Sequence, residues 1–118
     1  MKKTILIISN ESNLSSAIKN KLLEQDYEVI ITSESGEPLR KIIKEVFPDL
    51  VIISLLVSCF EAIELCLRIR RWCHVPLILV NNWVAGMDAP EKSGSCLLVK
   101  TNTIDDIMMR VESTFSRN

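Results

Sequence analysis

Glycine is scarce in this chain, with 3 residues among 118. A nucleotide-binding loop needs closely spaced glycines, because they let the backbone turn tightly and approach the phosphates. No G-x-G-x-x-G follows the first apolar run, and no G-x-x-x-x-G-K-[ST] occurs anywhere. The loops that hold dinucleotides and nucleoside triphosphates are therefore missing.

An excess of either charge is absent too. The 14 basic and 15 acidic residues give a formal charge of −1, which excludes the basic surface expected of a nucleic-acid or membrane binder. No apolar stretch approaches the roughly 20 residues that cross a membrane. The apolar run at 4–8, which follows Lys2 and Lys3, is too short for a signal peptide. We expect a cytoplasmic protein.

Redox and metal-binding patterns are also lacking. The four cysteines include no C-x-x-C pair, and Cys59, Cys66 and Cys73 recur every seven residues while Cys96 stands apart. On a helix this spacing places the three on one face, which favours small buried side chains over metal ligands. The single histidine, His74, has no acid or nucleophile beside it and is expected on the surface.

What the sequence does contain is a regular alternation of β-branched apolar runs with segments of helical period. Strands are predicted at 4–8, 28–32, 50–56, 76–80 and 96–99. The apolar stripes of the predicted helices are Leu14, Ala17, Ile18 and Leu22; Leu39, Ile42, Ile43, Val46 and Phe47; Ile63, Cys66, Ile69 and Cys73; and Ile104, Ile107, Met108, Val111 and Phe115. The alternation predicts an α/β protein with a five-stranded doubly wound parallel sheet, and residues 1–118 form a single domain.

Local signals support these boundaries. Pro38 suits a first helical turn, and Pro48 closes the second helix. The shorter run at 28–32 suits a sheet edge. Before the first helix, Ser12 or Asn13 is expected to be the N-cap. The alternative is that this hydroxyl-rich loop holds an anion at the helix N-terminus.

A candidate site follows from the predicted sheet, because ligands of doubly wound sheets bind outside the carboxyl ends of the strands. The residues in question are Ser9, Asn10 and Glu11 after the first strand, Ser54 after the third, Asn81 after the fourth and Lys100 after the fifth. No G-x-S-x-G pattern surrounds Ser54, so a hydrolase nucleophile is not indicated. We expect no enzymatic activity.

Several motifs in the same order resemble one family. Residues 47–56, FPDLVIISLL, resemble the P-D-L-[VI]-[IL]-[LI]-D-[LI] segment of response-regulator receiver domains, and 62–70, AIELCLRIR, resemble the G-[LI]-E-L-x-x-x-[IL]-R that follows at the same spacing. The segments 75–80 and 98–100 are similar to that family's fourth and fifth strands. The opening 5–11 resembles I-L-[IV]-V-D-D-[ED]. The resemblance spans almost the whole chain.

The resemblance implies a flavodoxin-like fold with strand order 2-1-3-4-5. It also implies a site in which an aspartate accepts a phosphoryl group from a histidine kinase, an acidic pair holds magnesium, and a hydroxyl residue and a lysine engage the phosphoryl oxygens. By position these correspond to Ser54 for the acceptor, Ser9, Asn10 and Glu11 for the acidic pocket, Asn81 and Leu97 for the switch, and Lys100 for the lysine. Of the acceptor aspartate, the acidic pair, the switch hydroxyl and the lysine, only the lysine is retained.

These differences remove the expected chemistry. Magnesium usually takes one or two carboxylates, and Glu11 is the only acid among the expected ligands. We therefore predict weak or absent magnesium binding and no other cofactor. A serine hydroxyl such as that of Ser54 is a poor nucleophile without a neighbouring base. The sequence thus predicts a degenerate pseudo-receiver that works independently of phosphorylation, as an interaction or dimerisation module in two-component signal transduction or transcription regulation.

The partner surface is less transferable. In the resembled family, the face of the fourth helix, fifth strand and fifth helix binds partners, which here is the 81–116 face. Its fourth helix is expected to be short, irregular or displaced, because the sequence around 84–94 lacks an amphipathic period. Trp83 and Met87 are either exposed partner anchors or fold back over the sheet.

Other readings stay open. One is a receiver-like switch that senses an anion or metabolite through Lys100 and the Ser9–Asn13 loop. Another, which the missing phosphate loop disfavours, is a small flavodoxin-like enzyme. The chain is either freestanding or the N-terminal part of a longer regulator.

Overall fold

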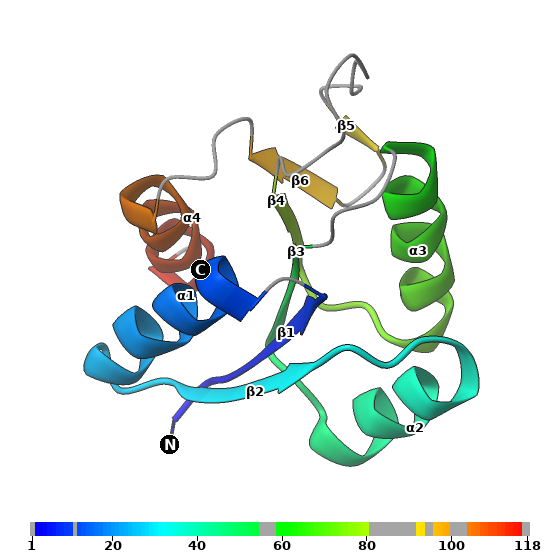
Figure 1. Ribbon diagram of the computed structural model, residues 1–118, viewed down its shortest axis with the longest axis horizontal. Coiled ribbons are helices and arrows are strands. Elements are labelled where there is room, and N and C mark those ends of the chain that lie inside the picture. The colour runs from blue at the N-terminus through cyan, green and yellow to red at the C-terminus, as the bar shows by residue number, and fades with distance from the viewer. Residues whose placement is uncertain are drawn as a thin grey trace.

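The computed structural model describes residues 2–10, 12–54, 59–80, 92–93, 96–99 and 104–116. Its strands are β1 (Thr4–Ser9), β2 (Glu28–Thr32), β3 (Leu50–Ser54), β4 (Leu77–Val80), β5 (Lys92–Ser93) and β6 (Cys96–Val99). Its helices are α1 (Ser12–Glu24), α2 (Gly36–Val46), α3 (Cys59–Trp72) and α4 (Ile104–Ser116). Figure 1 shows α1 and α4 on one face of the sheet and α2 and α3 on the other.

The sheet has the order β2-β1-β3-β4-β6-β5. Neighbours from β2 to β6 pair in parallel, whereas β5 pairs antiparallel with β6. The sheet therefore has six strands rather than the predicted five. The five predicted strands are neighbours in the predicted order 2-1-3-4-5, with β6 as the fifth, and β5 is an additional strand beside it. The additional strand β5 has two residues, which is too short for hydrophobic periodicity to reveal.

Most predicted boundaries are close to the observed ones. The strands at 28–32 and 96–99 are confirmed, and β1 is one residue longer than predicted. Strand β4 begins at Leu77 rather than at Pro76, which has no backbone N–H to donate to a ladder. The expectation of an irregular fourth helix around 84–90 lies outside the described residues.

Alternation along the central strands builds two cores. In β1, Ile5 and Ile7 pack with α1 and α4, while Leu6 and Ile8 pack with α2 and α3. All four side chains are at most 1% exposed, as expected for a strand covered on both faces. Strand β2 contains only exposed and half-buried residues and lies at an edge, as predicted.

The end of α2 differs from the prediction. Phe47 was expected in the apolar stripe of this helix, yet it has left-handed backbone angles (φ 50°, ψ 62°) and a side chain that is 77% exposed. Its N–H still donates to the Ile43 carbonyl at 3.1 Å. The reason is Pro48, because a residue before proline is disfavoured in the helical region.

Two further local predictions meet different outcomes. Helix α1 begins at Ser12, so Ser12 and Asn13 lie inside its first turn rather than at the capping position before it. Around the end of α3, Cys66 is buried and His74 is exposed, as predicted, whereas Cys73, which was expected to be buried, is half-buried.

Candidate functional site

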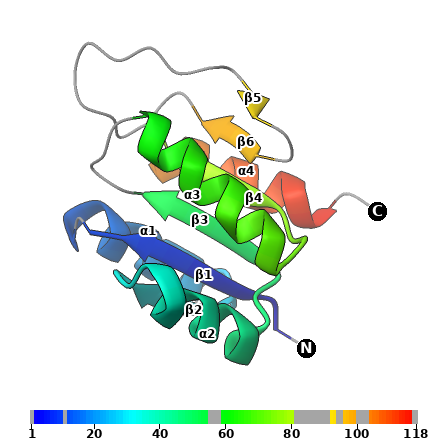
Figure 2. The same cartoon turned by 90° about the vertical axis from the view of Figure 1, so that its right-hand side faces the viewer.

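Two buried serines end the neighbouring strands β1 and β3. Ser9 and Ser54 are Cα partners in the parallel register, so their side chains point to the same face of the sheet. Ser9 is 5% exposed and Ser54 is 0% exposed. Figure 2 shows the carboxyl ends of β1 and β3 at the same edge, opposite the end of α4. The structure thus brings together two of the predicted site residues.

The hydroxyl of Ser54 is unusual for a buried polar group. Within the described part of the chain, its Oγ has essentially no solvent contact and no hydrogen-bond partner. Leaving a buried hydroxyl unpaired costs about 1–3 kcal/mol. Ser9 and Asn10, in contrast, each have an interaction partner. The end of β3 therefore holds a neutral polar group with no solvent contact.

The remaining predicted residues are only partly placed. Asn10 follows Ser9 and is exposed. Leu97 lies on β6, in register with Ile78 of β4, and its side chain is outside the described set. Glu11, Asn81, Trp83, Met87 and Lys100 also lie outside the described residues. Their convergence on Ser54 stays a prediction.

The described residues do not fit magnesium. At the ends of β1 and β3 they offer hydroxyl and amide oxygens from Ser9, Asn10 and Ser54, whereas protein-bound magnesium is usually held through carboxylates. Across the described ranges, no group of three or more His, Cys, Asp or Glu side chains could hold a metal ion. No step of a phosphotransfer reaction follows from this geometry.

At the amino ends of the strands, Asp49 links β1 to β3 by hydrogen bonds. Its carboxylate accepts a hydrogen bond from the Thr4 N–H at 2.8 Å, and its own N–H donates to the Thr4 carbonyl at 2.7 Å. The pair fixes the start of β1 against the start of β3. Asp49 therefore has a structural role that the motif at 47–56 contained but the sequence analysis did not assign.

The charged end of α3 is solvated only in part. Arg68 and Arg71 are exposed, but Arg70 is half-buried. Its Nη1 donates to the Cys73 carbonyl at 3.3 Å. Its buried Nη2 has no hydrogen-bond partner among the described residues. Arg70 thus closes the helix end as well as carrying charge.

A groove between α1 and α4 was not predicted. It has a volume of about 170 Å³ and is lined by Lys21, Gln25, Tyr27, Asp105, Met108 and Glu112. Burial and, second, the charge of Glu112 raise the pKa of the Tyr27 phenol. The sequence gives no signal for this groove, because its lining comes from opposite ends of the chain.

Comparison with known proteins defines the relatives. No protein-family model matches the chain. The transcriptional regulatory protein AfsQ1 of Streptomyces coelicolor is 31% identical over 78 residues, which cover 66% of this chain and 34% of the relative. The response regulator ArlR of Staphylococcus aureus is 25% identical over 119 residues, covering 96% of this chain and 52% of the relative. The chain spans about half the length of ArlR and about a third of AfsQ1.

Solved structures match over nearly the full chain. A receiver-modulated diguanylate cyclase from Pelobacter carbinolicus has 27% identity and a TM-score of 0.60, covering 98% of this chain and 99% of that chain. The BeF3-activated receiver domain of RstA from Klebsiella pneumoniae has 18% identity and a TM-score of 0.69, covering 98% and 100%. A putative response regulator from Chloroflexus aurantiacus has 20% identity and a TM-score of 0.71, covering 99% and 100%.

The last two structures are distant in sequence and show the fold alone, which is the flavodoxin-like receiver fold with a parallel sheet. The names of the sequence relatives indicate the family. Together they support the assignment of this chain to the response-regulator receiver domains of two-component signalling systems. Within the described residues, no helix is both long and apolar enough to span a membrane.

Proposed function

We propose that this chain is a phosphorylation-independent receiver domain, which acts through protein–protein contacts in signal transduction or transcription regulation. The observation that carries the proposal is the state of Ser54. It is fully buried, its hydroxyl is unpaired among the described residues, and its register partner is a second serine. A receiver that switches by phosphorylation needs an exposed nucleophile and a metal site at this place.

The chemistry of these residues supports the same conclusion. A serine hydroxyl attacks phosphorus slowly unless a base takes its proton, and Ser54 has no such partner in the described structure. A phosphoryl donor would also have to open the end of β3 to reach it. A phosphoserine would be a stable ester, so the signal would not reverse by itself. We propose no enzymatic activity for the domain.

The partner surface in this proposal is the 81–116 face, used for a protein partner or a second copy. Of that face the structure describes β5, β6 and α4. Residues 1–118 form one receiver-like domain in this proposal. AfsQ1 is named a transcriptional regulatory protein and ArlR a response regulator, which supports a regulatory role. In this proposal, the partner protein determines which process the chain regulates.

Beryllofluoride, which mimics a phosphoryl group, tests the proposal. The chain is titrated with magnesium and beryllofluoride while amide NMR spectra and sedimentation velocity are recorded. We expect neither a saturable shift nor a change of oligomeric state, because the carboxylates that bind magnesium are replaced at Ser9, Asn10 and Ser54. A receiver domain that retains its aspartate is the positive control.

Inorganic phosphate alone is the second arm of this experiment. Saturable shifts with beryllofluoride around Ser54 would refute phosphorylation independence. Shifts with phosphate alone, without magnesium, would instead support the anion-sensing alternative through Lys100 and the Ser9–Asn13 loop. If neither beryllofluoride nor phosphate causes saturable amide shifts, the result supports a domain that acts through protein–protein contacts.

A further inference from the structure

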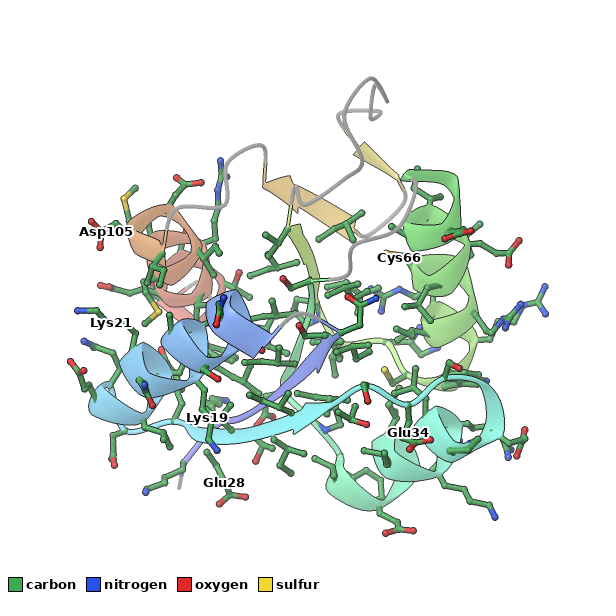
Figure 3. All side chains as sticks on the ribbon, viewed as in Figure 1. Lys19, Lys21, Glu28, Glu34, Cys66 and Asp105 are labelled. Atoms are coloured by element: carbon green, nitrogen blue, oxygen red, sulfur yellow. The ribbon has the colours of Figure 1, made fainter. Side chains whose placement is uncertain are left out.

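The groove between α1 and α4 combines two helical stripes. From α4 come Asp105, Met108 and Glu112, which share one side of that helix; from α1 comes Lys21, and Gln25 follows in the turn after α1. Figure 3 shows Lys21 and Asp105 on the same flank of the molecule, from α1 and α4 respectively. The groove is therefore formed where α1 and the turn after it pack beside α4.

Its charge is unbalanced. Two carboxylates, of Asp105 and Glu112, face one ammonium, of Lys21. None of the three forms an ion pair within the described residues, where the ion pairs are Lys2–Asp26, Arg40–Glu37 and Arg68–Glu64. The last turn of α4 carries no basic residue. The lining of the groove therefore has a formal charge of −1. Lys3 is not part of this lining; its ammonium lies 5.8 Å from the centroid of the Phe115 ring.

Its walls suit the stem of a basic side chain. The Tyr27 ring packs against Phe115 with ring centroids 5.4 Å apart, which holds the phenol in place. Met108 supplies a second apolar wall. Lysine and arginine carry an apolar stem that packs against such surfaces while the charged head finds a carboxylate, and an aromatic face attracts a cation.

Its size limits the ligand. About 170 Å³ is below the roughly 300–1,000 Å³ of pockets for drug-sized molecules, but it accommodates the head of one side chain. Beside the groove, Met109 is 67% exposed and lines a second hollow with Glu112, Ser113 and Ser116. An apolar neighbour of the inserted residue would contact Met109.

We propose that this groove binds one basic side chain, an arginine guanidinium or a lysine ammonium, presented by a partner protein. The head lies between Asp105 and Glu112, and the stem lies on Tyr27 and Met108. The inference rests on the proposed interaction function and names the chemistry of the partner. It adds a docking position between α1 and α4.

N-ethylguanidinium is the probe, with the neutral N-ethylurea as its matched control. In amide NMR titrations we expect saturable shifts at Lys21, Gln25 and Met108 with the cation and none with the urea. Each of Glu112→Gln and Asp105→Asn weakens binding about three-fold, as expected for one exposed charge pair. Glu45→Gln on α2, exposed and outside the groove, leaves it unchanged.

Lys21→Gln gives a result of opposite sign. Removing the competing ammonium strengthens binding of the cation, whereas it would weaken binding of an anion or a zwitterion. The peptides acetyl-Leu-Arg-Leu-amide and acetyl-Leu-citrulline-Leu-amide form the partner arm, and only the arginine peptide is expected to bind, more tightly than N-ethylguanidinium. Equal binding of the free cation and the arginine peptide would assign the groove to a small amine instead and overturn the partner proposal.

Equal shifts with cation and urea, or no effect of the Glu112 and Asp105 variants, would overturn the inference. All the variants change exposed side chains, and thermal unfolding checks that they fold. The beryllofluoride experiment reads a different edge of the sheet. If N-ethylguanidinium does not bind and beryllofluoride causes no shift, only the proposed docking position is refuted. If beryllofluoride causes saturable shifts, the proposed function is refuted.

Discussion

Tyr27 lines the α1–α4 groove and is the one tyrosine of the chain, so its absorbance reports on the groove. Burial and then the charge of Glu112 raise the pKa of its phenol above the ordinary value of about 10. We expect an absorbance titration of the phenolate to show this raised pKa. Glu112→Gln should lower it, and Glu45→Gln, far from the ring, should not.

The same shift has a consequence for stability. Since the pKa of Tyr27 is higher in the folded state than in the unfolded state, its contribution is complete below about pH 10 and is lost as the pH rises through the folded pKa. Urea unfolding at several alkaline pH values measures this loss. Tyr27→Phe should remove it, and an equally steep loss in that variant would contradict the assignment.

At the same scale, Ser54 and Ser9 show what sequence motifs can and cannot establish. The order of the motifs predicted that the ends of the first and third strands would be neighbours, and the parallel register of Ser9 with Ser54 confirms this. The missing hydrogen bond of the Ser54 hydroxyl could not be predicted, because it depends on what the surrounding backbone offers.

Among the elements, α2 carries a local conflict between sequence and backbone. Phe47 is left-handed at the end of this helix, a conformation that costs a residue with a Cβ roughly 1–2 kcal/mol. We expect Phe47→Gly to raise the free energy of unfolding by about 1 kcal/mol, since glycine adopts this conformation without strain. The exposed ring loses little burial.

Glu45→Gly, inside the same helix, is the matched control for Phe47→Gly. There the backbone is helical, and glycine should lower the free energy of unfolding by about 1 kcal/mol. Urea denaturation measures both variants. A loss of stability in Phe47→Gly would mean that the ring packs against the protein in solution.

The elements also show where periodicity succeeds. Long apolar runs predicted the buried strands β1, β3 and β4, because a strand covered on both faces excludes polar residues. The two-residue β5 has no period to detect. At the end of α2, Pro48 was correctly expected to close the helix, but Phe47 was expected in the apolar stripe because it continues the period, and its side chain is exposed instead.

For the whole molecule, the carboxyl ends of β1 and β3 differ in charge from the face covered by α1 and α4. The described polar side chains at those strand ends, Ser9, Asn10 and Ser54, are neutral. The α1–α4 groove lies on a helical face and is charged. Its lining residues are far apart in sequence, so only the packing of α1 against α4 brings them together.

Restoring the carboxylates tests whether the scaffold still has the geometry of an active receiver. In the triple variant Ser9→Asp, Asn10→Asp and Ser54→Asp, two acids occupy register partners at the ends of β1 and β3. Without metal, the unpaired buried carboxylates should lower the melting temperature. Magnesium should raise it again, because a ligand at 100 times its Kd stabilises the fold by about 2.7 kcal/mol.

The single variant Ser54→Asp is the control for the triple variant. It has the destabilising acid without the added ligands at Ser9 and Asn10, so magnesium should stabilise it far less. Calcium, which prefers a larger and more flexible oxygen cage, should stabilise the triple variant less than magnesium does. If magnesium leaves the melting temperature of the triple variant unchanged, the loops around Ser54 have diverged together with the side chains, and the scaffold serves contacts alone.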